Sequence, residues 1–253
     1  MKVTAIIPAR YGSTRFPGKP LALINGLPMV QHVCQRVSKA KMVDRVVVAT
    51  DDARIVAAVE NFGGDVVLTR SDHPTGTDRL AEVALNIDSE LIVNVQGDEP
   101  LIDPRMVDQV IAPLVRDPHL QMGTLASKID QLDDFYNSNV VKVVKDQHGL
   151  ALYFSRAPIP CPRDLDSDQL AKSLPQLGLL RHIGIYVYRR GLLLEYPSWP
   201  KTPLENLENL EQLRALERGI KLYVAETGFS CHGVDTPADL ERVAILMSAE
   251  NNN

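Results

Sequence analysis

The sequence predicts an α/β fold: a doubly wound, mostly parallel sheet that carries a β-rich insertion. Short apolar or β-branched runs alternate with helical segments from residue 3 to about residue 116, and the connections are short. Such alternation is typical of a mostly parallel sheet with helices on both faces. After residue 120, runs with strand character follow one another with few helical segments between them. We expect one domain over residues 1–248, with its core in 1–120 and 203–248, the insertion in 121–202 and a frayed tail in 249–253.

The first half of the chain supplies the alternation. Its expected strands are buried runs of the kind found in parallel sheets: Val3–Ile7, Arg45–Ala49, Asp65–Leu68 and Leu91–Val95. Its expected helices are Pro28–Ala40, Ala53–Glu60, Thr77–Asn86 and Pro104–Val115. Asp51 or Asp52 is expected to cap the second helix, and Pro104 suits the first position of the fourth.

The second half of the chain does not continue this alternation of strands and helices. Its expected strands are Met122–Ile129, Val140–Lys145, Leu150–Phe154 and Arg181–Arg189. The segment Ser155–Leu179 is rich in proline and polar residues, which predicts a loop or a lid. Helical spacing returns at Pro203–Arg218 and at Pro237–Met247.

Composition excludes several classes of protein. The chain has 253 residues and a formal net charge of -5, so no broad basic surface for nucleic acid is expected. No run of 18 apolar residues occurs, which predicts that nothing spans a membrane. The first residues, MKVTAIIPAR, hold too short an apolar run for a secretory signal. Cys34, Cys161 and Cys231 are far apart and odd in number, which predicts a reducing, cytoplasmic setting.

A basic loop, Pro8–Lys19, follows the first expected strand directly. It carries Arg10, Arg15 and Lys19, together with two glycines that allow close backbone approach. Ligands of parallel sheets bind at the carboxyl ends of the strands, so this loop is a candidate phosphate site. It is not a Walker A loop, because proline follows the lysine. A solvated basic turn is the alternative interpretation.

Two carboxylates are candidate metal ligands. Asp98 comes just after the expected strand Leu91–Val95, and Asp235 comes just before the last expected helix. Mg²⁺ takes one or two carboxylates together with substrate phosphates and water. If the two carboxylates meet, they need a cation, because like charges about 4 Å apart repel by about 4 kcal/mol at an effective dielectric constant of 20. The alternative is that each only caps a turn or helix.

Four further sites each have a structural alternative. Either Thr77 or Asp78 only caps a helix and Arg79 is only a surface residue, or their turn lies beside a bound base. Arg156 could bind a carboxylate through two hydrogen bonds. His182 and Tyr186 share one face of an expected strand, where a histidine is more often structural. The pair Glu211 and Gln212 lies off a leucine stripe, on what is usually a solvated face.

Taken together, these segments resemble the 3-deoxy-manno-octulosonate cytidylyltransferases, also called CMP-Kdo synthetases. The resemblance covers about residues 3 to 247. It is carried by the order and spacing of the blocks IIPARYGSTRFPGKPL, VVVATDD, TGTDRLAEV, IVNVQGDEPLI, NVVKVV, ALYFSRAPIP, LRHIGIYVYRRG, PLENLENLEQLRALERG and GVDTPADLERV. The order is far more specific than any one block. CMP-sialate synthetases share the first block, but not the RHIGIY and LEQLR blocks in this form.

The resemblance implies a reaction in which CMP passes from CTP to the anomeric 2-hydroxyl of the sugar acid Kdo and pyrophosphate leaves. This reaction activates Kdo for lipopolysaccharide biosynthesis. The resemblance also implies a nucleotide-diphospho-sugar transferase-like fold, Mg²⁺ as cofactor, and a homodimer built through the insertion, which also binds the sugar.

The resemblance further implies roles for individual residues. It implies that CTP contacts Pro8, Ala9, Arg10, Arg15, Lys19, Thr77, Arg79 and Gln96. It implies that the sugar acid contacts Gln96, Arg156, His182, Tyr186, Glu211 and Gln212. The residues implied to act in catalysis are Arg10, Lys19, Asp98 and Asp235, of which Asp98 and Asp235 hold the metal.

Two departures from the family pattern flank these motifs. Cys161 stands where an aromatic residue is common, and Cys231-His232 replaces small residues before GVDTP. They concern the fit of the substrate and not the reaction class. Two rival functions stay open at this point: a nucleotidyltransferase for sialate or a sugar phosphate, and a non-catalytic module that binds CTP.

Overall fold

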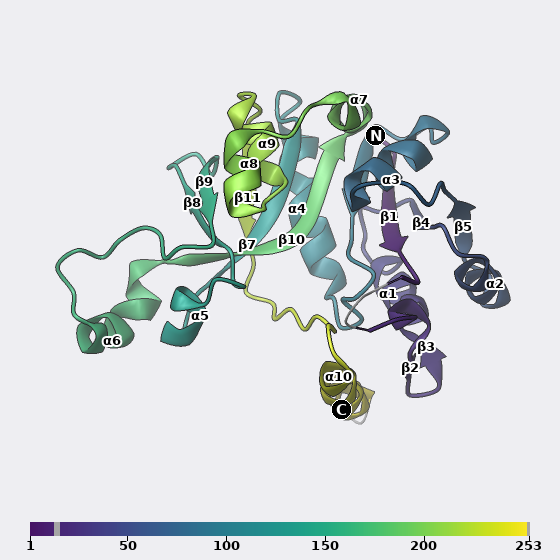
Figure 1. Cartoon of the computed structure of the whole chain (residues 1–253), viewed down its shortest axis with the longest axis horizontal. Coiled ribbons are helices and arrows are strands. Elements are labelled where there is room, and N and C mark those ends of the chain that lie inside the picture. The colour runs from purple at the N-terminus through teal and green to yellow at the C-terminus, as the bar shows by residue number, and fades with distance from the viewer. Residues whose placement is uncertain (13–15, 252–253) are drawn as a thin grey trace.

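The computed structural model describes residues 1–12 and 16–251. A central sheet runs through the molecule in the strand order β11-β7-β10-β6-β1-β4-β5 (Figure 1). Its strands are β1 (Val3–Ala9), β4 (Arg45–Thr50), β5 (Asp65–Leu68), β6 (Leu91–Asn94), β7 (Met122–Lys128), β10 (Leu180–Arg189) and β11 (Leu222–Glu226). Parallel pairing joins β1 to β4 and β6, β4 to β5, and β11 to β7. Strand β10 is antiparallel to both of its neighbours, β6 and β7. The predicted mostly parallel α/β sheet is confirmed.

Helices cover both faces of this sheet. Their bounds are α1 (Met29–Val37), α2 (Ala53–Asn61), α3 (Gly76–Leu85), α4 (Pro104–Arg116), α5 (Leu132–Tyr136), α6 (Ser167–Leu177), α7 (Arg190–Glu195), α8 (Pro203–Glu208), α9 (Gln212–Glu217) and α10 (Pro237–Asn251). The shorter elements are the 3-10 helices η1 (Lys19–Leu21) and η2 (Tyr196–Ser198), the hairpin β2 (Leu23–Ile24) and β3 (Leu27–Pro28), and the pair β8 (Lys142–Lys145) and β9 (Ala151–Ser155). Among the residues described, no helix is both long enough and apolar enough to cross a bilayer.

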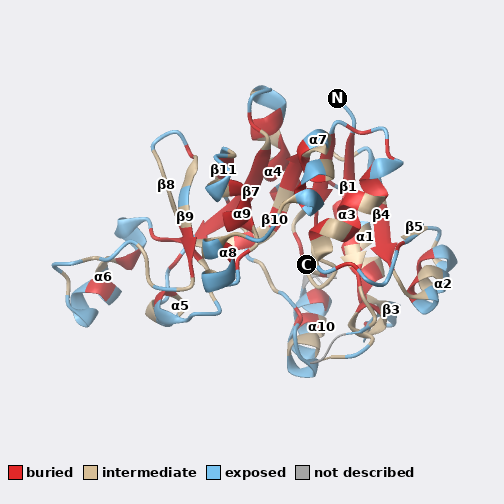
Figure 2. Ribbon diagram, turned by 45° about the horizontal axis from the view of Figure 1, so that its top comes forward, coloured by how far each residue is buried: buried red, intermediate tan, exposed pale blue. Residues whose placement is uncertain are grey.

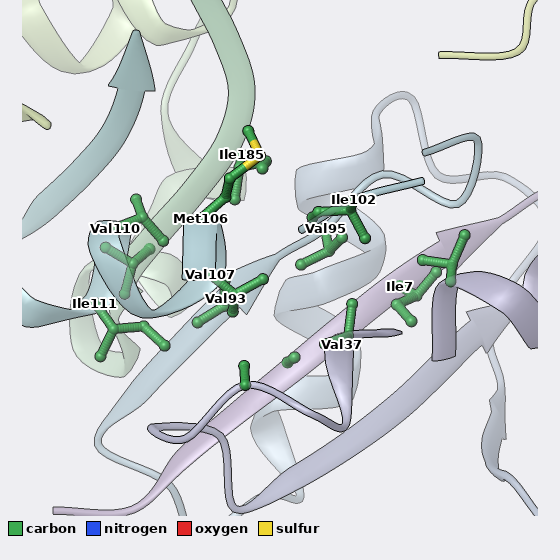
Figure 3. Close-up of a cluster of buried hydrophobic side chains, with 14 of the residues drawn as sticks. Ile7, Val37, Val93, Val95, Ile102, Met106, Val107, Val110, Ile111 and Ile185 are labelled. Atoms are coloured by element: carbon green, nitrogen blue, oxygen red, sulfur yellow. The ribbon is translucent and has the colours of Figure 1, made fainter. Parts of the chain in front are cut away.

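Strand β1 shows why the sheet is buried on both faces. Successive side chains of a strand point to opposite faces. Accordingly, Ile7 lies in the core formed with α1 and α4, whereas Ile6 packs in the core on the other face with Leu80 of α3. Figure 3 shows the first of these cores, where Val93 of β6 and Val107 of α4 are drawn with Ile7. Figure 2 shows the same pattern across the central strands, which are buried, while α10 exposes a large surface.

Local sequence signals explain where helices α2 and α3 begin. Asp52 caps α2 by accepting a hydrogen bond from the Arg54 backbone amide. Thr75 and Asp78 form a capping box at the start of α3, in which each side chain bonds the backbone amide of the other. Both caps lie beside the carboxyl ends of β4 and β1, and they fix the turns that approach those ends.

Several elements differ from the sequence-based expectations, and α5, α7 and the hairpin of β2 and β3 were not expected. Helix α6 forms inside the expected loop, because Asp166 and Gln169 make a capping box and Leu170 packs in a small separate core with Phe135 of α5. The expected helix Pro203–Arg218 is divided, because Asn209 adopts a left-handed conformation with φ of 51° between α8 and α9. Strand β11 was not expected at all.

The region expected to form an insertion shares its sheet with the core. Strands β7 and β10 lie between β11 and β6 in the central sheet. Strand β8 pairs with β10 and with β9, and β8 and β9 form an arm with α5 and α6 on one side of the molecule (Figure 1).

Candidate active site

A cleft of about 550 Å³ opens at the carboxyl ends of β1 and β6. Five segments that are distant in the sequence line this cleft. They are the end of β1 with the loop after it, the start of η1, the turn before α3, the turn after β6 and the segment just before α10. Its lining residues are Pro8, Ala9, Arg10, Gly12, Lys19, Pro20, Pro74, Thr75, Gly76, Gln96, Gly97, Asp98 and Asp235. The predicted basic loop and both predicted carboxylates therefore face one cleft. Arg15, which was also predicted to contact phosphate, lies outside the residues that the structure describes.

Lys19 joins the two carboxylates. Its Nζ lies 2.6 Å from Oδ2 of Asp98, 3.3 Å from Oδ1 of Asp235 and 2.9 Å from the Val234 carbonyl oxygen. Burial opposes the charged form of Lys19, but the charges of Asp98 and Asp235 outweigh it and raise the pKa of the lysine. The sequence could not show whether these carboxylates meet, and the structure shows that they do, with one cation between them.

The donor set in this place suits Mg²⁺. Two carboxylates and a surrounding cleft wide enough for phosphates and water match what this ion takes from proteins. Lys19 shows that the two carboxylates already attract a cation. Lysine has a flexible stem, so its ammonium group is able to move away from the carboxylates.

Arg10 connects the basic loop to the turn before α3. Its Nη2 donates to the carbonyl oxygens of His73, at 2.8 Å, and of Thr75, at 3.2 Å. Arg10 is half-buried and lines the cleft, so the same guanidinium holds the turn and faces the space available to a ligand.

A second, smaller cavity of about 210 Å³ adjoins the cleft. It is lined by Gly76, Thr77, Asn94, Gln96, Tyr186, Tyr188, Tyr196, Glu211 and Gln212. Gly76 and Gln96 line both spaces, so the cavity and the cleft are continuous there. The cavity brings together five residues predicted to contact the ligands, namely Thr77, Gln96, Tyr186, Glu211 and Gln212.

The cavity offers both hydrogen-bond donors and acceptors. Nε2 of Gln212 is buried without a hydrogen-bond partner among the described residues, so it can donate to a ligand. Burial raises the pKa of Glu211, although the Thr77 hydroxyl and Arg214 act in the opposite direction. Burial also raises the pKa of Tyr186, which keeps its phenol neutral. A few placed polar groups of this kind fix the orientation of a bound ligand.

Sequence reasoning missed three lining residues of this cavity: Asn94, Tyr188 and Tyr196. A signal existed for Tyr188, because it follows Tyr186 at the two-residue period of a strand. No such signal existed for Tyr196, which reaches the cavity from η2 and donates a hydrogen bond to the Glu211 carbonyl oxygen at 2.8 Å.

Among the predicted site residues that the structure describes, three line neither space. Arg79 is fully buried beneath the turn before α3, where it pairs with Asp51 at 2.8 Å and with the Thr69 hydroxyl. Its guanidinium therefore joins α3 to the strand ends, and the expected role of Arg79 beside the base stays a prediction. Arg156 donates from its three nitrogens to the carbonyl oxygens of Glu208, Ser138 and Asn209. These bonds use three of the five N–H groups of the guanidinium and hold Arg156 at the junction of α8 and α9, and its expected contact with the carboxylate of the sugar acid stays a prediction.

His182 is the third of these residues. Its Nε2 lies 2.9 Å from the Thr124 hydroxyl, and its ring packs between Phe154 and Tyr186. Burial lowers the pKa of His182 to about 3, so the ring is neutral near pH 7. The histidine supports Tyr186, which does line the cavity.

Comparisons with known proteins agree with this geometry. The chain matches the cytidylyltransferase family model over residues 4–222. It is 58% identical to the 3-deoxy-manno-octulosonate cytidylyltransferase of Syntrophotalea carbinolica, covering 96% of this chain and 97% of that protein. It is also 58% identical to the protein of the same name in Geobacter sulfurreducens, covering 96% of this chain and 98% of that protein. A solved structure of CMP:2-keto-3-deoxy-manno-octonic acid synthetase complexed with CTP has a TM-score of 0.91 and 44% identity, covering 99% of this chain and 100% of the other.

Proposed function

Because the chain belongs to the cytidylyltransferase family, we propose that its cleft and its adjoining cavity bind the two substrates of one transfer reaction. The chain transfers CMP from CTP to Kdo, releasing pyrophosphate and giving the activated sugar used for lipopolysaccharide biosynthesis. In our proposal the cleft around Lys19 and Asp98 holds the triphosphate. The polar cavity around Gln212 holds the sugar acid. The observation that carries this assignment is that Gly76 and Gln96 line both spaces, so the two substrates can meet there.

The sugar hydroxyl attacks the α-phosphorus of CTP and releases its proton to solvent, a new phosphorus–oxygen bond forms, and the bond to pyrophosphate breaks. Arg10 and Lys19 are placed to stabilise the charge on the phosphates, and removing one such preorganised group costs roughly 10²–10³ in rate. Gln96, at the junction, orients the reacting groups; its Nε2 donates to the Gly184 carbonyl oxygen at 3.2 Å, which fixes the direction of the amide. A covalent intermediate on the protein is not required.

Asp98 and Asp235 would hold Mg²⁺ in this proposal. The ion would neutralise the two carboxylates and the phosphates, and it would lower the pKa of the attacking hydroxyl. Lys19 stabilises the carboxylates before the ion arrives, and its flexible side chain then serves the phosphates.

Pyrophosphate release tests the reaction and the ion together. We expect release only when CTP, Kdo and Mg²⁺ are all present, with none of the three dispensable. Sialate in place of Kdo should give little product, since the cavity is formed by residues of the RHIGIY and LEQLR blocks. Asp98→Asn and Asp235→Asn should each lose most turnover while the thermal transition is retained. Near-normal turnover in either variant would remove that residue from the metal site.

We further propose that the protein acts as a homodimer in the cytoplasm. The arm formed by β8, β9, α5 and α6 exposes Tyr136, Leu152 and Leu177, which are 53%, 63% and 40% accessible. Exposed apolar side chains on these elements favour a contact with a second copy of the chain. Light scattering should give about twice the chain mass of 28.0 kDa. A single-chain mass at micromolar concentration would contradict the dimer.

A further inference from the structure

The segment between β11 and α10, residues 227–235, has no regular secondary structure and yet carries Asp235 to the cleft. Figure 1 shows it as an extended connection that crosses from the sheet to the C-terminal helix. We call this segment the strap. Ordering each residue of an irregular segment costs about 1–2 kcal/mol, so specific contacts must hold the strap in place. The position of Asp235 depends on those contacts.

Glu99 provides a contact in the middle of the strap. The Cys231 sulfur lies 2.9 Å from Oε2 of Glu99, and the backbone amide of His232 also donates to this carboxyl group. Burial raises the pKa of the Cys231 thiol, so the sulfur keeps its hydrogen and acts as the donor. At Gly233 an added Cβ would lie 3.2 Å from Oε1 of Glu99, so the backbone of the strap runs directly against the carboxyl group.

Two other contacts fix the end of the strap. The Val234 amide donates to the Asp98 carbonyl oxygen at 2.9 Å, and the Val234 side chain is fully buried with Leu101 and Val243. Asp98 and Glu99 are neighbours in one turn after β6. Consequently one short turn has two roles. The carboxyl group of Asp98 faces the cleft, and the carboxyl group of Glu99 holds the strap, which carries Asp235.

We propose that Glu99 and Cys231 are positioning residues that fix the strap and thereby set where Asp235 lies relative to Asp98. This inference rests on the proposed function, in which these two aspartates hold Mg²⁺. Neither Glu99 nor Cys231 is among the residues that line the cleft, so both act through Asp235. When the contact is lost, the arrangement with both aspartates in place is only partly populated. The apparent affinity for the metal ion then falls in proportion to the fraction of molecules that keep both aspartates in place. A saturating concentration of the metal ion restores the rate.

Cysteine variants test the inference. Cys231→Ala removes the donor, Cys231→Ser keeps one, and Cys161→Ala is the control because Cys161 is exposed. The first measurement is amide hydrogen exchange in a peptide covering residues 229–236, without CTP or metal. We expect exchange about fivefold faster in Cys231→Ala, which corresponds to losing one hydrogen bond of about 1 kcal/mol. Cys231→Ser and Cys161→Ala should resemble the unmodified protein.

The second measurement is Mn²⁺ binding in the presence of CTP, followed by electron paramagnetic resonance, together with the KM for Mg²⁺. Cys231→Ala should weaken Mn²⁺ binding and raise the KM for Mg²⁺ by at most about fivefold, with kcat at saturating Mg²⁺ retained. Unchanged exchange in residues 229–236 overturns the inference, and so does faster exchange with unchanged Mn²⁺ binding. Asp235→Asn separates the premise from the inference: if that variant binds Mn²⁺ normally, the proposed metal site is wrong, whatever the exchange of the strap shows.

Discussion

Gly97 makes the closest backbone approach in the cleft, and its replacement by alanine tests the geometry of the site directly. An added Cβ would lie 2.8 Å from the Pro8 carbonyl oxygen, which belongs to the backbone at the end of β1. An ordinary contact begins at 3.4 Å, so the two strand ends must separate by roughly 0.6 Å. Overpacking of this kind costs about 1–3 kcal/mol. For a chain of this size, we expect Gly97→Ala to lower the Tm by roughly 2–12 °C.

The same displacement should reduce activity, because Gly97 lies between two residues of the site, Gln96 and Asp98. A misplacement of about 1 Å can cost roughly 10²-fold in rate, so a loss of roughly tenfold or more in kcat/KM is expected from Gly97→Ala. Pyrophosphate release and a thermal melt measure the two effects. Gly191→Ala is the matched control, since it adds the same methyl group in α7 with nothing within 4 Å. The argument is refuted if Gly97→Ala keeps the activity and Tm of the unmodified protein, or if Gly191→Ala loses as much.

Three more predictions concern the groups around the cleft and the cavity. Asp51→Asn leaves the fully buried guanidinium of Arg79 without its carboxylate, so urea unfolding should show a loss of about 3–5 kcal/mol, and a loss below about 1 kcal/mol would contradict the buried pair. Because the pKa of His182 falls to about 3 in the folded protein, its contribution to stability is complete above the unfolded value of about 6.5 and is lost as the pH falls toward 3. His182→Gln should therefore flatten the fall in unfolding free energy between pH 7 and pH 5, and an unchanged slope would show that the ring is not held neutral. Gln212→Leu should raise the KM for Kdo about tenfold with the KM for CTP unchanged, and equal effects on both would place the amide outside the sugar cavity.

The first half of the fold could be predicted because its signals are local. The strand at Leu91–Val95 is a continuous apolar run, and β6 follows it closely as Leu91–Asn94. The expected cap of the second helix is Asp52 in the structure. In contrast, the division between α8 and α9 depends on the left-handed conformation of Asn209, which interrupts a leucine pattern that is otherwise continuous. Helix α6 was missed because its apolar residues pack only in a small core of the arm.

Individual residues of the site could be predicted from the sequence, but the contacts between them could not. Chemistry-bearing residues could be recognised at the ends of strands, yet Lys19 and Asp235 are 216 positions apart and only the fold brings them together. The same limit applies to Arg79 and Arg156, whose partners could not be predicted from the sequence. A sequence shows that a guanidinium is present, but its partner decides its role, and Asp51 supplies that partner for Arg79 from another turn. Cys231 illustrates the reverse case, since a departure from the family pattern marked a residue that contacts Glu99.

The arrangement around Lys19 explains how a chain with a net charge of -5 can hold a triphosphate. The carboxylates of Asp98 and Asp235 would repel both each other and the phosphates if no cation lay between them. Lys19 removes that repulsion within the protein, since it lies within 3.3 Å of both. In the proposed mechanism a metal ion would take its place, keep the carboxylates neutralised and free the ammonium group for the phosphates. The positive charge of the site would then increase when the substrate arrives with the proposed metal ion, which would favour binding of the two together over binding of either alone.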